Sequence, residues 1–316
     1  MATTTSITTT YAGEFAGKYI AAALLSSKTL EEGAIEIKPN VKYKEVIKKV
    51  ATDSNVIKNA TCDFTDTATV TLTERILQPE EFQVNLEFCK KDFRSDWEAI
   101  QMGYSAFDNL PPAFSDFIIG HVAGLVAEKN EQNIWGGVNA TAGEFDGFTV
   151  LMAADSDVND AVNTGITSIT SANIVSILEN TVDALPSAVY GKEDLTIYLP
   201  TNAFQAYVRS LGGFGASGLG AAGVGAQGAL WYNMGNALSF DGIKIQLTPG
   251  MPTDHVVAAQ KSNLYFGTGL LSDHNEVKLI DMADIDGSQN VRVVMRFTAG
   301  VQYGIGSDIA LFTLAS

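Results

Sequence analysis

An extended, polar segment near the N-terminus constrains the fold more than any other feature of this sequence. Between residues 34 and 90 apolar and polar residues alternate, as at Val41/Tyr43 and Val70/Leu72, and the run ATVTLTERIL (68–77) is rich in β-branched residues. Such alternation is typical of half-buried strands. The intervening TDSNVIKNATCDFTDT (52–67) has few aliphatic residues and many turn formers. Because two long strands without a core are marginally stable alone, we expect a protruding hairpin that packs on another chain.

A long helix is predicted over residues 111–135. Pro111 and Pro112 suit a first helical turn, apolar residues recur at helical spacing from 114 to 126, and Gly136-Gly137 ends the pattern. At the helical rise this segment would extend about 37 Å. Its longest weakly polar run, 117–127, is about half of the roughly 20 residues that a membrane span needs. We therefore expect a long helix of a folded domain and no transmembrane segment.

The remainder of the chain has the pattern of a mixed α/β domain. Residues 1–13 form a Thr-rich tail, 14–27 are predicted to be a short helix, and 212–228 are rich in Gly and Ala. Further helices are predicted over 171–182 and from Pro200 to Val208. Predicted strands lie at 195–199, 243–247, 255–259, 263–266, 277–280, 291–297 and 309–314.

Charge is sparse and unevenly distributed. The 316 residues include 20 basic and 36 acidic side chains, a net charge of −16, and only 18% of residues are charged, whereas about a quarter is usual. Residues 101–200 carry a net charge of −11, while residues 38–58 carry +4. A chain poor in Lys and Arg is unsuited to gripping phosphates, so nucleic-acid binding is not expected as its main task. The +4 segment is either a solvated face or an arm that lies on an acidic surface of a neighbour.

Two sequence patterns resemble ligand sites but lack the required context. GxGxxG occurs twice in 218–228 with Asp241 downstream, but six glycines at 215–228 discourage the helix that dinucleotide binding needs. Asp155, Asp157 and Asn159 match the first three ligand positions of a calcium loop, but position twelve is Ile166. We interpret the first as a loop and expect no dedicated metal site at the second.

Signals for catalysis and export are equally weak. His121, His255 and His274 form no paired-ligand pattern, and Ser272-Asp273-His274 are adjacent in sequence, which does not place a nucleophile and base facing each other. Cys62 and Cys89 fit no disulfide framework, so we expect free thiols in a reducing cytosol. No secretory signal is present. We therefore predict a protein that is not an enzyme and uses no cofactor.

Several stretches, taken in order, resemble one protein family. They are NIWGGVNATAGEFDGF (133–148), LTIYLPTNAFQAYV (195–208), GIKIQLTPGMP (242–252), KSNLYFGTGLLSD (261–273) and NVRVVMRFTAGVQYGIGSDIALF (290–312). Together with the polar arm, the extended excursion and the long helix, they resemble the major capsid protein of tailed double-stranded-DNA bacteriophages. The resemblance spans most of the chain and rests on the order of its parts. It implies the α+β shell fold that encapsulins and herpesvirus capsid floors share.

The resemblance also implies an organisation and a role. The expected parts are an N-terminal arm (1–33), an extended loop (34–78), a peripheral domain (79–160) with its spine helix (111–135), an α/β axial domain (161–270), and strands returning to the peripheral domain (271–316). The chain would self-assemble into pentamers and hexamers of an icosahedral head that encloses double-stranded DNA without sequence-specific binding. It would form the virion capsid, assembled in the host cytoplasm with a separate scaffolding protein, a portal and possibly a decoration protein.

We predict inter-subunit contacts at the extended loop and around the Gly-rich stretch. The predicted contact residues are Lys42, Lys44, Lys48, Lys49, Arg75, Gly213, Phe214 and Trp231. As a hypothesis, the +4 segment docks on the acid-rich 101–200 block of a neighbour, each exposed ion pair contributing about 0–1 kcal/mol. Two alternatives stay open: an encapsulin-type compartment, and a bacterial surface-layer protein, which would need an export signal.

Overall fold

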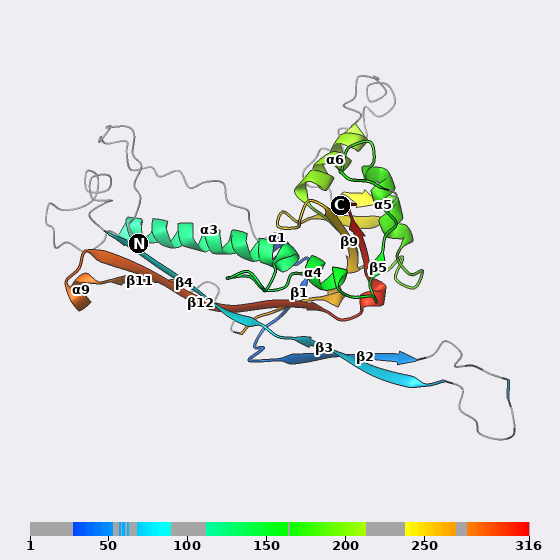
Figure 1. Cartoon of the computed structure of the whole chain (residues 1–316), viewed down its shortest axis with the longest axis horizontal. Helices are drawn as coiled ribbons and strands as arrows, with labels where there is room; N and C mark the ends of the chain where they lie inside the picture. The colour runs from blue at the N-terminus through cyan, green and yellow to red at the C-terminus, as the bar shows by residue number, and fades with distance from the viewer. Residues whose placement is uncertain are drawn as a thin grey trace.

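A long helix, two sheets and a projecting hairpin make up the fold (Figure 1). The computed structural model describes residues 28–52, 57, 59–60, 62, 68–89, 112–163, 165–212, 238–269 and 277–315. Helix α3 (Pro112–Gly136) lies along an elongated sheet, and a wedge-shaped domain stands at its C-terminal end. The hairpin points away from both. The predicted long helix is therefore confirmed, with bounds shifted by one residue.

The elongated sheet has five strands and is organised around β12 (Asn290–Tyr303). Residues 290–299 of β12 pair with β4 (Glu80–Cys89), and residues 291–295 pair on their other side with β11 (Val277–Asp281). The last four residues pair with β10 (Leu264–Gly267), which pairs in parallel with β1 (Glu36–Lys38). Alternate residues of β12, from Val291 to Tyr303, are buried, so one face of this sheet packs against the core.

The wedge-shaped domain is built on a six-stranded sheet. The strand order is β5 (Asn159–Asp160), β13 (Ala310–Thr313), β9 (His255–Gln260), β6 (Leu195–Leu199), β8 (Ile243–Leu247) and β7 (Ser239–Phe240). Helices α5 (Ile174–Asp183) and α6 (Thr201–Gly212) cover one face, where Ile197 and Phe312 are fully buried. Tyr198 and Leu311 point to the opposite face, toward the end of α3. The sheet is therefore buried on both sides.

An aromatic cluster joins the two sheets at the end of α3. The ring of Trp135 lies 5.4 Å from that of Phe148, at the start of α4 (Phe148–Ala153), and 5.0 Å from that of Tyr198. The Tyr198 hydroxyl donates to the carbonyl of Ala34, 2.6 Å away, which lies between α1 (Lys28–Glu31) and β1. These contacts hold the helix end, both sheets and the segment before β1 as one core.

Three expectations differ from the structure. The last strand, β13, does not return to the peripheral part but pairs with β9 and β5 in the six-stranded sheet, where Ala310 to Phe312 are buried on both faces. Strand β10 belongs to the five-stranded sheet rather than to the 161–270 unit. Residues 41–43 form no strand, because the left-handed φ of 65° at Asn40 interrupts the extended chain. The predicted helix 14–27 and the Gly-rich residues from 213 onward lie outside the described residues.

Candidate inter-subunit surface

The hairpin carries an exposed apolar face. Strands β2 (Glu45–Thr52) and β3 (Val70–Leu77) form a two-stranded antiparallel sheet that no other strand extends within the described residues. Val46 lies opposite Ile76, and Val50 lies opposite Leu72, on the same face. These four side chains are 44%, 43%, 64% and 71% exposed. A row of half-exposed aliphatic side chains on a projecting element is typical of a protein–protein contact.

The opposite face of the hairpin turns toward the body at its root. Leu77 is fully buried, and its side chain lies so close to Gly267 of β10 that a Cβ there would come within 2.9 Å of it. The side-chain amide of Gln302 in β12 donates to the Ile76 carbonyl at 3.2 Å. These contacts join the end of β3 to the five-stranded sheet.

A lysine secures the start of β2. The Lys38 ammonium donates to the Glu45 carboxylate at 2.7 Å and lies 4.8 Å from the centre of the Tyr265 ring. The hydrogen bond to Glu45 raises the pKa of Lys38, although partial burial opposes it. One of the lysines of the +4 segment is therefore used within the subunit.

Arg75 holds the other strand of the hairpin to the body. Its guanidinium donates to the Asp155 carboxylate and lies 3.9 Å from that of Asp157. It also lies 4.5 Å from the centre of the Tyr303 ring, and the Tyr303 hydroxyl donates to Asp155 at 2.7 Å. Burial raises the pKa of Asp155, but the hydrogen bonds from Tyr303, from the Asp157 backbone N–H and from Arg75 outweigh it, so the pKa is lowered.

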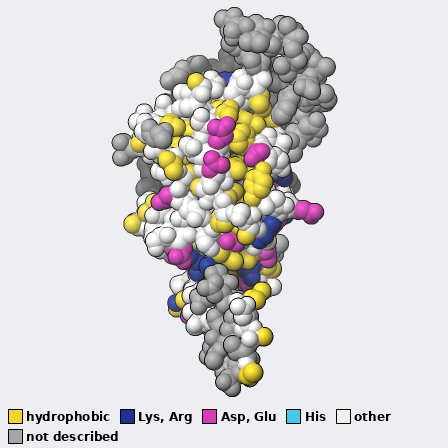
Figure 2. All heavy atoms as spheres, turned by 90° about the vertical axis from the view of Figure 1, so that its right-hand side faces the viewer, with side chains coloured by type: hydrophobic (Ala, Val, Ile, Leu, Met, Phe, Trp, Pro, Cys, Tyr) yellow, Lys and Arg dark blue, Asp and Glu magenta, His cyan; other side chains and the backbone are white. Residues whose placement is uncertain are grey.

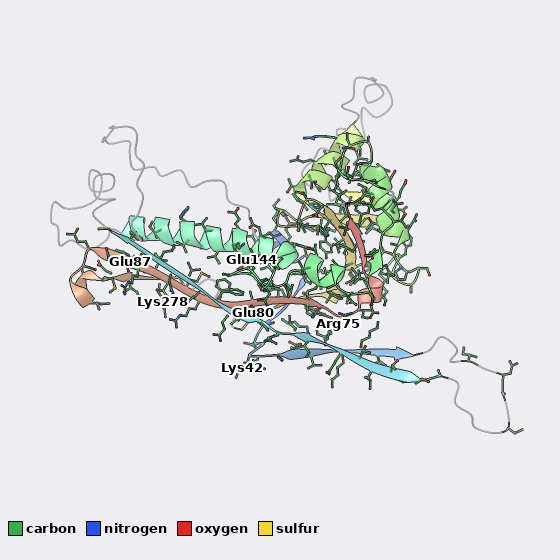
Figure 3. The ribbon with its side chains drawn as sticks, viewed as in Figure 1. Lys42, Arg75, Glu80, Glu87, Glu144 and Lys278 are labelled. Atoms are coloured by element: carbon green, nitrogen blue, oxygen red, sulfur yellow. The ribbon has the colours of Figure 1, made fainter. Side chains whose placement is uncertain are left out.

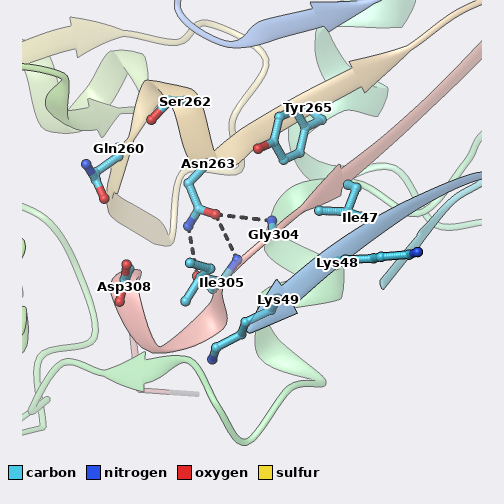
Figure 4. Close-up of a pocket in the computed structure, with 10 residues that line it drawn as sticks. All are labelled: Ile47, Lys48, Lys49, Gln260, Ser262, Asn263, Tyr265, Gly304, Ile305 and Asp308. Atoms are coloured by element: carbon cyan, nitrogen blue, oxygen red, sulfur yellow. Dashed lines mark hydrogen bonds between the residues drawn. The ribbon is translucent and has the colours of Figure 1, made fainter. Parts of the chain in front are cut away.

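A cavity of about 170 Å³ lies in the angle between the hairpin and the body (Figure 4). Lys48 and Lys49 leave β2 in opposite directions, and Lys49 extends along the cavity with Asp308 on its far wall. Asn263 accepts from the backbone N–H groups of Gly304 and Ile305 and donates to the Ile305 carbonyl. The polar groups of Asn263, Gly304 and Ile305 therefore satisfy one another within the subunit.

The predicted contact residues have different positions in the structure. Lys42 and Lys44 are exposed before β2, with Lys42 directed away from the body (Figure 3), and Lys48 is exposed on the apolar face opposite Glu74. The guanidinium of Arg75, another predicted contact residue, contacts Asp155 of the same chain. Gly213, Phe214 and Trp231 lie outside the described residues. The Val70/Leu72 alternation predicted a strand in this part of the hairpin. Nothing in that alternation showed which face of the strand is exposed.

Protein groups bind the side chains of Asp155 and Asn159, two of the three residues of the calcium-like pattern. Asp155 accepts from Tyr303 and Arg75, and the Asn159 side-chain amide donates to the carbonyls of Ser307 and Ile309. Among the described residues, no group of three or more His, Cys, Asp or Glu side chains is arranged to hold a metal ion. In the same part of the chain, no helix is long and apolar enough to cross a membrane.

The surface at the end of the molecule that carries the six-stranded sheet combines acidic, basic and hydrophobic side chains (Figure 2). Acidic and hydrophobic side chains are interspersed over its upper part, and most of the basic side chains visible in this view lie lower, next to the hairpin. Exposed hydrophobic side chains include Val162, at 67%, and Tyr190, at 47%. Apolar and acidic side chains therefore lie close together on this part of the surface.

Comparison with known proteins identifies the fold. No protein-family model matches the sequence, and a search of curated proteins finds no match. Among solved structures, the capsid of a native GTA particle matches with a TM-score of 0.65 at 13% identity, over 94% of this chain and 93% of that chain. The capsid of cyanophage P-SCSP1u matches with a TM-score of 0.56 at 13% identity, over 96% and 93%. A structure from Mycobacterium phage Adephagia gives 0.59 at 14% identity, over 94% and 92%.

The chain has the tailed-phage capsid fold. The predicted α+β class and the predicted fold are thereby confirmed. The match to the GTA capsid spans 94% of the chain.

Proposed function

We propose that this chain is a shell subunit that self-assembles into the pentamers and hexamers of an icosahedral phage head. The observation that carries the proposal is the capsid fold over nearly the whole chain, with a TM-score of 0.65 over 94% of its residues. The exposed apolar hairpin supports it independently, because a lone subunit gains nothing from such a face. The wedge-shaped domain would take the axial position of a pentamer or hexamer, and the five-stranded sheet with α3 the peripheral position.

In this proposal the apolar hairpin face supplies most of the contact energy. Fully burying a Val, Leu or Ile side chain contributes about 1.5–3 kcal/mol, so a half-exposed one still gains about 1 kcal/mol when a neighbour covers it. Val46, Val50, Leu72 and Ile76 are in this state. Exposed ion pairs contribute about 0–1 kcal/mol each, so Lys42, Lys44 and Lys48 would chiefly orient the contact.

The geometry of a shell follows from this contact. A hairpin on one subunit that binds the body of the next is a heterologous contact, which generates a closed ring when the rotation between subunits closes. The overall charge of −16 suits a shell that encloses double-stranded DNA without gripping it. A scaffolding protein, a portal, a possible decoration protein and assembly in the host cytoplasm complete the proposal.

Acidic substitutions on the apolar face test this role. In the Val50→Asp/Leu72→Asp variant, two charges would be buried without partners on assembly, so we expect a folded subunit that forms no particles. Thr73→Asp is the matched control, because Thr73 is exposed on the same strand but on the opposite face. Circular dichroism reports folding, and sedimentation velocity reports particles. If the double variant forms normal particles, the apolar hairpin face does not make the proposed contact.

A further inference from the structure

We infer that Arg75 is a positioning residue: with Asp155, Asp157 and Tyr303 it forms a clamp that fixes the direction of the hairpin before any neighbour binds. The four clamp residues come from β3, from the segment after α4 and from the end of β12. Figure 3 places Arg75 where the hairpin meets the body. The effect of this clamp on assembly rests on the proposed function, but the direction of the hairpin in a free subunit does not.

The hairpin needs such a clamp because its own strands do not orient it. A two-stranded sheet is marginally stable alone, and β2–β3 has no further strand beside it within the described residues. Leu77, the Ile76 carbonyl and the Lys38–Glu45 ion pair fix only the root of the hairpin, at the end of β3 and the start of β2. Arg75 acts two residues farther out, opposite Ile47, and therefore extends the fixed region along the hairpin.

The chemistry of the clamp favours a single arrangement. The guanidinium donates to the Asp155 carboxylate and lies over the Tyr303 ring, with its central carbon 4.5 Å from the ring centre, two contacts that a lysine ammonium does not reproduce together. The Arg75 and Asp155 side chains are 26% and 19% exposed, so water screens their interaction less than at an open surface. The Tyr303 hydroxyl, bonded to Asp155 at 2.7 Å, fixes the carboxylate in turn.

Gly306 allows the clamp to close. A Cβ at this position would come within 2.9 Å of the Asp155 carboxylate and 3.3 Å of the Arg75 guanidinium. Both distances are tighter than ordinary contacts, so a side chain there would separate the two groups. Residue 306 lies in the turn between β12 and β13, which binds the clamp to both sheets.

The consequence is a hairpin that is ordered in the free subunit. A segment that becomes ordered only on binding binds more weakly, because ordering it costs conformational entropy. A segment that is already ordered in the free protein avoids that cost. In a shell, where each subunit repeats the same contact, a fixed hairpin direction also selects the correct neighbour geometry.

The test measures the hairpin direction in unassembled, full-length subunits. Single-molecule FRET uses one dye on native Cys62, which is exposed beyond the hairpin strands, and one on Val162→Cys of the body, in a Cys89→Ser background. We expect one narrow distance distribution for the otherwise unchanged chain and a broad one for Arg75→Met. Amide hydrogen exchange in β2 and β3 should accelerate about 10-fold, while exchange in β6 and β9 stays unchanged.

Two further variants separate positioning from general destabilisation. Lys42→Met removes the same charge from an exposed site near the hairpin root, and it should leave the distance distribution unchanged. Tyr303→Phe keeps the ring beneath Arg75 but removes the bond to Asp155, so an intermediate broadening is expected. An unchanged distance distribution in folded Arg75→Met overturns the inference. If Arg75→Met does not fold, an unchanged distance distribution in Tyr303→Phe overturns it instead. Failure of the parent chain to form shells would count against the proposed function alone.

Discussion

Glu131 is a buried carboxylate that ties the segment before β1 to helix α3. It accepts from the backbone N–H of Thr29 at 3.1 Å and from the Thr29 hydroxyl at 2.5 Å, and this hydroxyl also accepts from the Trp135 indole N–H at 2.9 Å. Burial raises the pKa of Glu131, although the hydrogen bonds from Thr29 and Gly250 oppose the shift. The neutral acid is therefore favoured in the folded state relative to the unfolded chain.

This shift predicts a pH dependence with a defined sign. A raised pKa gives stability that is fully present below the unfolded value, about 4.3, and is lost as the pH rises through the folded value. The free energy of unfolding of the wild type, relative to that of Glu131→Gln, should therefore fall between pH 4 and pH 7. Denaturant titrations of unassembled subunits at several pH values provide the measurement.

Glu144→Gln is the matched control for this measurement. The hydrogen bond from Lys129, at 2.5 Å, lowers the pKa of Glu144, so its contribution is present above the unfolded pKa and is lost as the pH falls. The free energy of unfolding of the wild type, relative to that of Glu144→Gln, should rise with pH, which is opposite to the trend expected for Glu131→Gln. If the free energy of unfolding relative to Glu131→Gln also rises with pH, the folded protein favours the ionised form of Glu131.

At the scale of elements, helix α3 shows how one element meets two different environments. Near its C-terminal end the 248–252 turn crosses so closely that a Cβ on Gly250 would overlap the backbone of Glu131 and Gln132. Farther toward the N-terminus, a Cβ on Gly120 would meet no atom of the described residues within 4 Å. The same substitution should therefore have opposite effects at the two positions.

We predict that Gly250→Ala destabilises the subunit by about 1–3 kcal/mol, the usual cost of overpacking. Gly120→Ala should stabilise it by about 0.5–1 kcal/mol, because Ala costs less than Gly in a helix interior. Thermal and denaturant unfolding of the two variants, measured side by side, check both signs. Equal effects at the two positions would mean that the 248–252 turn does not press on the helix.

The local sequence pattern predicted where helices and strands lie better than it predicted which other elements they contact. Prolines at the start and glycines at the end predicted α3 to within a residue, and β-branched alternation predicted β3. Sequence pattern did not place β13 in the six-stranded sheet or direct Arg75 toward Asp155, because both depend on residues far apart in the chain. Of the predicted contact lysines, Lys42, Lys44 and Lys48 are exposed, but no pattern showed that aliphatic side chains cover much of the same hairpin.

At the scale of the whole molecule, the distribution of charge and apolar surface gains a structural meaning. The +4 segment reaches from β1 into the hairpin, and one of its lysines, Lys38, is bonded to Glu45 within the subunit. The acid-rich 101–200 block spans α3 and the first part of the wedge-shaped domain. The subunit therefore combines an exposed apolar hairpin face with an acid-rich body, and Lys42, Lys44 and Lys48 lie exposed on or near that face.

Negative-stain electron microscopy of the purified protein shows whether the chain assembles into a shell. We expect closed shells, or free pentamers and hexamers, in at least one condition of a salt series with and without a co-expressed scaffolding protein. Nuclease-resistant duplex DNA inside particles recovered from infected cells would further separate a phage head from a protein compartment. A folded chain that stays monomeric under every one of these conditions would contradict its role as a shell subunit.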